Sequence, residues 1–111
     1  MTIENYHAHV YYDEISRHAA EVLREEIAQR FAVKMGRWRE KPVGPHPQPM
    51  YQVAFEPKLF TAIVPWLLLN RNNLDILIHP NTGTSLADHT NHALWMGNKL
   101  TLRLGELDDA N

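Results

Sequence analysis

The alternation of apolar and polar residues along the chain predicts four main β-strands. Residues 6–12 alternate and are rich in residues that favour strands, which is typical of a strand with one buried face. Residues 33–39 predict a second, less regular strand, and residues 50–55 predict a third. An apolar run predicts a fourth strand over residues 74–79, and because a proline follows His79, we expect this histidine at the strand's end.

Two longer segments carry the apolar spacing of helices. Residues 14–30 place an apolar side chain at every third or fourth position, and Asp13 before them is a plausible N-cap. Pro57 suits the first turn of a second helix, although we expect Pro65 to kink or interrupt it. The segment over residues 41–49 is too rich in proline for regular structure and predicts a stiff loop.

The resulting order of strands and helices is βαββαβ, which predicts an α+β, ferredoxin-like sandwich. After it, residues 86–95 predict a short helix and residues 99–104 a last strand, which together form a C-terminal extension. The acidic tail over residues 106–111 is expected to fray. A chain of 111 residues can bury one core, so we expect a single domain over residues 1–111.

Composition and charge exclude several classes of function. The net charge of −2, with histidine neutral, leaves no basic surface for nucleic acid or for an anionic membrane. The absence of cysteine excludes disulfides and thiolate metal ligands. The first residues lack the basic and apolar regions of a signal peptide, and no apolar run is long enough to span a bilayer. We therefore expect a cytoplasmic protein.

Three of the seven histidines are predicted to meet on one face of the sheet. In the predicted topology the strand order is 4-1-3-2, so the start of the first strand lies beside the end of the fourth. His7 and His9 are two residues apart and therefore project from the same face. His79 lies across the ladder, where Cβ atoms are about 5 Å apart and side chains can share one metal ion. Three imidazoles suit Zn, Fe(II), Cu or Ni, and they exclude the oxygen cage that Ca or Mg prefers.

The other histidines leave more than one interpretation open. His46 stands between two prolines, either as a solvent-exposed loop residue or as a residue that reaches the site. It could reach the site by folding over the open face of the sheet or by crossing a dimer interface. Asp88 and His89 are neighbours, but adjacent residues of a helix do not face each other, and Asp88 can equally cap the helix. For any single histidine, an ordinary surface or hydrogen-bonded role remains the alternative.

Five short motifs follow one another along the chain. They are YHAHVYY at residues 6–12, GPHPQPMY at residues 44–51, HPNTG at residues 79–83, DHT at residues 88–90 and WMG at residues 95–97. In this order they resemble the DOPA 4,5-dioxygenase family of the small fungal and bacterial type, which is distinct from the larger plant extradiol enzymes.

The resemblance implies a non-haem Fe(II) extradiol dioxygenase that opens the ring of DOPA or a related catechol with O₂. Such a centre needs about three protein ligands on one face, so that the catechol and O₂ find open positions. His7, His9 and His79 are the expected ligands, with an acidic residue such as Asp88 as the alternative to one of them. Zn or Ni could substitute for iron.

The resemblance also places His46 and His89 in matching motifs, and we expect them to handle protons, since imidazole titrates near neutrality. Arg37 or Arg39 is a candidate clamp for a substrate carboxylate. The alternative function is a non-catalytic metal- or ligand-binding protein, in which a second subunit covers the open sheet face. A homodimer is compatible with either function.

Overall fold

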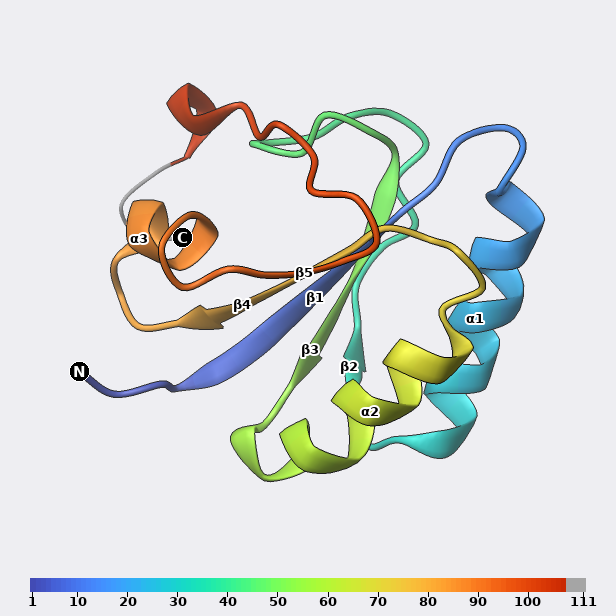
Figure 1. The fold of residues 1–111 in the computed structure, drawn as a ribbon, viewed down its shortest axis with the longest axis horizontal. Helices are drawn as coiled ribbons and strands as arrows, with labels where there is room; N and C mark the ends of the chain where they lie inside the picture. The colour runs from blue at the N-terminus through green and yellow to red at the C-terminus, as the bar shows by residue number, and fades with distance from the viewer. Residues whose placement is uncertain (108–111) are drawn as a thin grey trace.

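A five-stranded antiparallel sheet forms the centre of the computed structural model, which describes residues 1–107 (Figure 1). The strand order is β2-β3-β1-β4-β5, and β1 lies in the middle with an antiparallel neighbour on each side. The predicted order of the first four strands is therefore confirmed, as is the α+β class. The strands are β1 (Asn5–Tyr11), β2 (Lys34–Met35), β3 (Met50–Phe55), β4 (Ile76–Asn81) and β5 (Leu94–Met96).

Helices α1 (Arg17–Arg30) and α2 (Phe60–Asn70) cover one face of this sheet (Figure 1). Ala8 and Val10 of β1 belong to the main hydrophobic core, together with buried side chains from both helices. Because side chains alternate along a strand, burial of these two residues leaves their odd-numbered neighbours on the other face. The pattern of β1 thus directs its histidines away from the helices, as predicted.

The second face of the sheet is covered in part by the chain after β4 and by the proline-rich loop 41–49. The backbone N–H of Arg103 donates a hydrogen bond of 2.8 Å to the carbonyl of Pro45, which ties these two segments together. These segments bury part of this face within one chain, and the homodimer stays a prediction. A smaller apolar cluster lies here, made of Tyr11, Met50 and Leu77 with partly buried Ala93, Trp95, Leu100 and Leu102.

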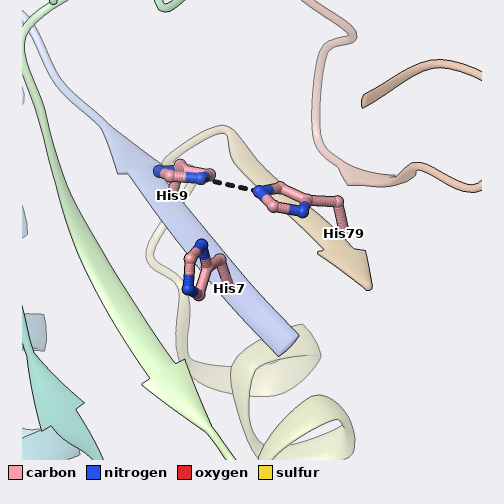
Figure 2. A group of neighbouring side chains, drawn as sticks. All are labelled: His7, His9 and His79. Carbon is pink, nitrogen blue, oxygen red and sulfur yellow. Dashed lines mark hydrogen bonds between the residues drawn. The ribbon is translucent and has the colours of Figure 1, made fainter. Parts of the chain in front are cut away.

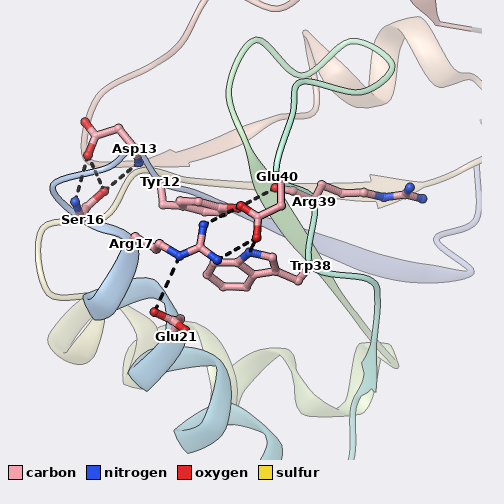
Figure 3. A network of polar contacts seen from close by, with 8 residues as sticks. All are labelled: Tyr12, Asp13, Ser16, Arg17, Glu21, Trp38, Arg39 and Glu40. Atoms are coloured by element: carbon pink, nitrogen blue, oxygen red, sulfur yellow. Dashed lines mark hydrogen bonds and ion pairs between the residues drawn. The ribbon is translucent and has the colours of Figure 1, made fainter.

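A polar network fastens the start of loop 41–49 to α1 (Figure 3). The hydroxyl of Tyr12 donates to the carbonyl of Arg39 at 2.6 Å. The guanidinium of Arg17 contacts both carboxylate oxygens of Glu40, one of them at 2.7 Å. The indole N–H of Trp38 donates to the same carboxylate at 3.0 Å. These contacts hold the point at which the loop carrying the predicted site histidine leaves the sheet.

The first helix and the second strand are shorter than predicted. Helix α1 begins at Arg17, because Asp13 accepts hydrogen bonds of 2.9 Å from Ser16 in a turn that precedes the helix. Between the Met35–Val53 pair and the Arg39–Met50 bridge, one strand advances by four residues and the other by three. The extra residue makes a bulge, which ends the regular pairing of β2.

Contrary to the prediction, Pro80 and Pro65 do not interrupt the strand and the helix that contain them. Strand β4 continues past His79 through Pro80 to Asn81. Strand β5 pairs only with Ile76–Ile78 of β4, so this edge of β4 is unpaired at Pro80. Proline has no N–H to donate, and an unpaired edge tolerates that loss. Pro57 opens a short 3₁₀ turn (Pro57–Leu59), and α2 then runs through Pro65 without interruption.

The C-terminal extension differs most from the prediction. The expected helix over residues 86–95 is limited to α3 (Ser85–His89), and Leu94–Met96 instead forms β5 on the edge of β4. The expected strand over residues 99–104 is absent from the described chain, which ends in a 3₁₀ turn, η2 (Leu104–Glu106). The end of the acidic tail, residues 108–111, lies outside the described residues. Within residues 1–107, no helix has the length and apolar character needed to cross a bilayer.

Candidate functional site

The pairing of β1 with β4 brings three histidines together on the face opposite the long helices (Figure 2). His7 lies directly across the ladder from His79, and His9 follows two residues later on β1. One ring nitrogen from each of these three residues lies within 4.8 Å of the other two. The convergence predicted from strand spacing is therefore confirmed, and the group could bind a metal ion.

The spacing of the ring nitrogens of His9 and His79 suits one metal ion. His9 Nε2 and His79 Nε2 are 3.0 Å apart. Two nitrogens bound about 2.1 Å from one ion and about 90° apart are separated by about 3.0 Å, so the pair matches neighbouring ligands of a single ion. Nδ1 of His79 donates to the carbonyl of Pro80 at 2.9 Å, which leaves the lone pair on Nε2. Within residues 1–107, the buried Nδ1 of His9 has no hydrogen-bond partner.

The proline-rich loop brings a fourth histidine, His46, onto the same face. Its ring centre lies 4.1 Å from that of His9. Nδ1 of His46 and the hydroxyl of Tyr11 are 2.7 Å apart, share a hydrogen bond and are both buried. Of the two routes considered for His46, the loop takes the first and folds over the sheet of its own chain. Tyr11 had no predicted role, although its spacing from His7 and His9 on one strand indicated a shared face.

A fifth histidine, His89, comes from the short helix α3. Its ring centre lies 4.1 Å from that of His79, and its Nδ1 donates to the carbonyl of Ser85 at 2.8 Å. The carbonyl can only accept a hydrogen bond, so Nε2 of His89 keeps its lone pair. The two predicted acid-base residues, His46 and His89, therefore both stand beside the three-histidine group.

Asp88, the possible carboxylate ligand, is engaged elsewhere. Its carboxylate accepts hydrogen bonds from the backbone N–H and the hydroxyl of Thr82, at 2.8 and 2.7 Å, and pairs with His92 at 3.0 Å. Burial acts to raise the pKa of Asp88, but these hydrogen bonds outweigh it and lower the pKa below its ordinary value. Asp88 thus ties α3 to the end of β4 and does not join the histidine group.

A pocket of about 250 Å³ opens over the histidines. All five line it, together with residues 43–45 of the proline-rich loop and with Glu106 and Leu107 of the C-terminal segment. A cavity of about 150 Å³ holds a benzene molecule, so this pocket has room for one substituted aromatic ring. Arg37 and Arg39 are exposed and do not line it, so the predicted carboxylate clamp is not found there.

The histidines of the site are held in their neutral form. Burial is the main cause in every case, and it lowers the pKa of His79 to about 3 and that of His46 to about 4. Burial and the neighbouring imidazoles hold the pKa of His9 well below its usual range, and the pKa values of His7 and His89 are also lowered. A neutral imidazole is the form that binds metal ions, so the site needs no deprotonation near neutral pH. The expectation that His46 titrates near neutrality is not met in the metal-free protein, because burial lowers its pKa.

These pKa shifts predict that the metal-free protein loses stability in acid. In the unfolded chain a histidine takes up a proton near pH 6.5, whereas folded His79 does so only near pH 3. The unfolded state therefore binds more protons below pH 6.5, and the stabilisation present above that pH is lost as the pH falls. At about 1.4 kcal/mol per pH unit, His79 alone lowers the free energy of unfolding by about 2 kcal/mol at pH 5.

Urea denaturation at pH 7 and pH 5, with a chelator present, measures this loss. A His18→Gln variant is the control, because His18 is an exposed residue of α1 outside the site. It should lose as much stability between the two pH values as the unmodified protein. An unfolding free energy that is equal at both pH values would contradict the proposed burial of neutral imidazoles.

Comparison with known proteins identifies the family. Residues 6–106 match the model of the Dopa 4,5-dioxygenase family. A DOPA 4,5-dioxygenase of Amanita muscaria is 31% identical over 114 residues, which cover 95% of this chain and 50% of that protein. An uncharacterised 21.2 kDa protein of Botryotinia fuckeliana is 40% identical over 108 residues, which cover 86% and 59% of the two chains. The chain thus spans about half the length of the curated relatives it matches.

A solved structure shares this fold. The crystal structure of a candidate dioxygenase from Nostoc punctiforme PCC 73102, at 1.46 Å resolution, matches with a TM-score of 0.92 and 52% sequence identity. The match covers 93% of this chain and 90% of that chain. With the family model covering the sheet, the loop and all five histidines of the pocket, the chain belongs to the Dopa 4,5-dioxygenase family.

Proposed function

We propose that this protein is an extradiol dioxygenase that opens the ring of a catechol with O₂, using Fe(II) held by His7, His9 and His79. One observation carries the proposal. Three imidazole nitrogens within 4.8 Å of one another lie on the wall of a pocket of about 250 Å³, beside space for a single aromatic ring. The family to which the chain belongs supports the same reaction class.

The three ligands come from two adjacent strands and approach the ion from one side. A bound Fe(II) would supply open positions for the two catechol oxygens and for O₂, and so would bring the reactants together. His9 and His79 are buried, with 3% and 0% of their surface exposed, so the reacting end of the catechol lies deep in the pocket. This burial keeps bulk water from the reacting atoms.

His46 and His89 are proposed to carry the protons of the reaction. Binding a catechol through both oxygens releases protons, and opening the ring requires a proton to be returned. Tyr11 occupies Nδ1 of His46, and the carbonyl of Ser85 occupies Nδ1 of His89. In both rings the remaining nitrogen, Nε2, is the one available to the substrate. The two hydrogen bonds also fix the orientation of each ring, which proton transfer in a defined direction requires.

The proposed reaction balances without a further reductant. Both atoms of O₂ enter the product, and the ring bond between one hydroxylated carbon and its unhydroxylated neighbour breaks. The product is a semialdehyde that carries a new carboxylate. Because each O₂ consumed opens one ring, oxygen uptake and product formation have a fixed ratio.

Oxygen uptake by protein reconstituted anaerobically with Fe(II) tests the proposal. L-DOPA, caffeate and protocatechuate are supplied in parallel, and the yellow semialdehyde is followed by absorbance. We expect uptake of one O₂ per ring opened with at least one of these catechols. Iron binding without O₂ uptake would remove the dioxygenase proposal and leave the non-catalytic metal-binding protein in its place. Failure to bind any metal would show that the histidine group itself is not a metal site.

A further inference from the structure

Glu106 is the one carboxylate among the described residues that line the pocket. Among residues 1–107, its lining includes Glu106 but neither arginine nor lysine. Within the same residues, Glu106 forms no ion pair. Among the described residues of the lining, no lysine or arginine therefore balances the Glu106 carboxylate.

The carboxylate belongs to the mouth of the pocket. Glu106 is exposed, whereas His9 and His79 are buried at the far end. Glu106 lies in η2, where its backbone N–H donates to the carbonyl of Arg103 at 3.0 Å. The backbone N–H of Arg103 in turn donates to the carbonyl of Pro45, on the proline-rich loop that also lines the pocket. These backbone contacts fix the position of the turn that carries Glu106 at the edge of the pocket.

The proposed site sets the direction in which the substituent of a 4-substituted catechol points. Its two hydroxyl groups must reach the three-histidine group, so its substituent, on the far side of the ring, points towards the mouth. A charged group on that substituent then comes near Glu106. A carboxylate there meets repulsion, with no lysine or arginine in the described lining to offset it, whereas an ammonium group meets attraction.

We propose that Glu106 makes the pocket select catechols whose substituent carries a positive charge over those that carry only a carboxylate. This inference rests on the proposed function, because it places the catechol oxygens at the histidines. It assigns Glu106 as a specificity-determining residue of this pocket. An exposed charge pair is partly screened by water, so we expect a preference of about tenfold rather than several hundredfold.

Three catechols of matched size separate charge from shape. Dopamine carries an ammonium group, 3-(3,4-dihydroxyphenyl)propionate carries a carboxylate, and 4-ethylcatechol is neutral. Their dissociation constants are measured on Fe(II)-loaded protein without O₂, so that binding is read without turnover. We expect dopamine to bind about tenfold more tightly than the propionate, with 4-ethylcatechol between them. Because salt screens exposed charges, the difference should shrink as ionic strength rises.

Substitutions of Glu106 test the assignment directly. Glu106→Gln should bring the dissociation constants of dopamine and the propionate within about threefold, and Glu106→Lys should reverse their order. Glu25→Lys makes the same change in net charge at an exposed position of α1 outside the pocket, and it should keep the original order.

The outcomes separate this inference from the proposed function. If the three catechols bind equally, or if Glu106→Lys leaves their order unchanged while the ring is still opened, the role of Glu106 is overturned and the dioxygenase stands. If Fe(II)-loaded protein neither binds nor opens any catechol, the proposed function fails, and this inference fails with it.

Discussion

Replacing His79 with alanine is expected to abolish metal binding and, with it, ring opening. His79 is fully buried and lies opposite His7, and its Nε2 is 3.0 Å from that of His9. The carbonyl of Pro80 holds its ring in the tautomer that can bind a metal ion. Loss of a partner that only orients a ligand typically weakens metal binding 10- to 100-fold, so loss of a ligand itself should cost more than about 100-fold.

Metal content after dialysis, and competition against a chelator of known affinity, measure this effect. Because alanine leaves a cavity in a buried position, a second variant, His79→Gln, keeps most of the side-chain volume. His92→Ala is the matched control, since His92 contacts Asp88 and does not line the pocket. If His79→Ala and His79→Gln bind Fe(II) as the unmodified protein does, the three-histidine site is incorrect.

Replacing His46 with glutamine is expected to lower kcat by about 10²- to 10⁴-fold while the bound metal is retained. The reason is that His46 contacts the ring of His9 and the hydroxyl of Tyr11 but lies outside the group of three ligands. Its loss should remove proton transfer and leave the metal in place. Glutamine fills much of the same volume, so the variant should fold.

Steady-state kinetics and metal analysis of the same samples separate the two possible roles of His46. Tyr11→Phe removes the hydrogen bond to Nδ1 but keeps both rings, so its kcat should lie between those of His46→Gln and the unmodified protein. A His46→Gln protein with unchanged kcat would make this residue a wall of the pocket only. Loss of metal in that variant would instead make His46 a ligand.

The local pattern of β1 was sufficient to place two site residues. Ala8 and Val10 require a buried face, and the period of two along a strand then puts His7 and His9 on the opposite face. If the pairing of β1 with its neighbours shifted by one residue, both histidines would be buried against the helices. The apolar pattern of β1 therefore also restricts the register of its pairing. The position of His79 followed from the βαββαβ order, because that topology brings the end of the fourth strand beside the start of the first.

What the sequence could not determine depends on contacts between distant segments. Local propensity favoured a helix over residues 86–95, but the free edge of β4 supplied backbone partners, and Leu94–Met96 became a strand. The carbonyl of Pro45 and the N–H of Arg103 are far apart in sequence, yet their hydrogen bond brings the C-terminal segment to the loop. No periodic pattern of apolar and polar residues in the sequence indicates such a contact.

The functional site also combines features that the sequence predicts with features that depend on contacts between distant segments. The sequence by itself determined which histidines share a face of the sheet, because side-chain direction along a strand is a local property. Only the tertiary structure decided that loop 41–49 folds back over this face, that Tyr11 orients His46, and that Glu106 stands at the mouth in place of an arginine. These features arise from the packing of loops, whose paths are set by long-range contacts and not by the residues within them.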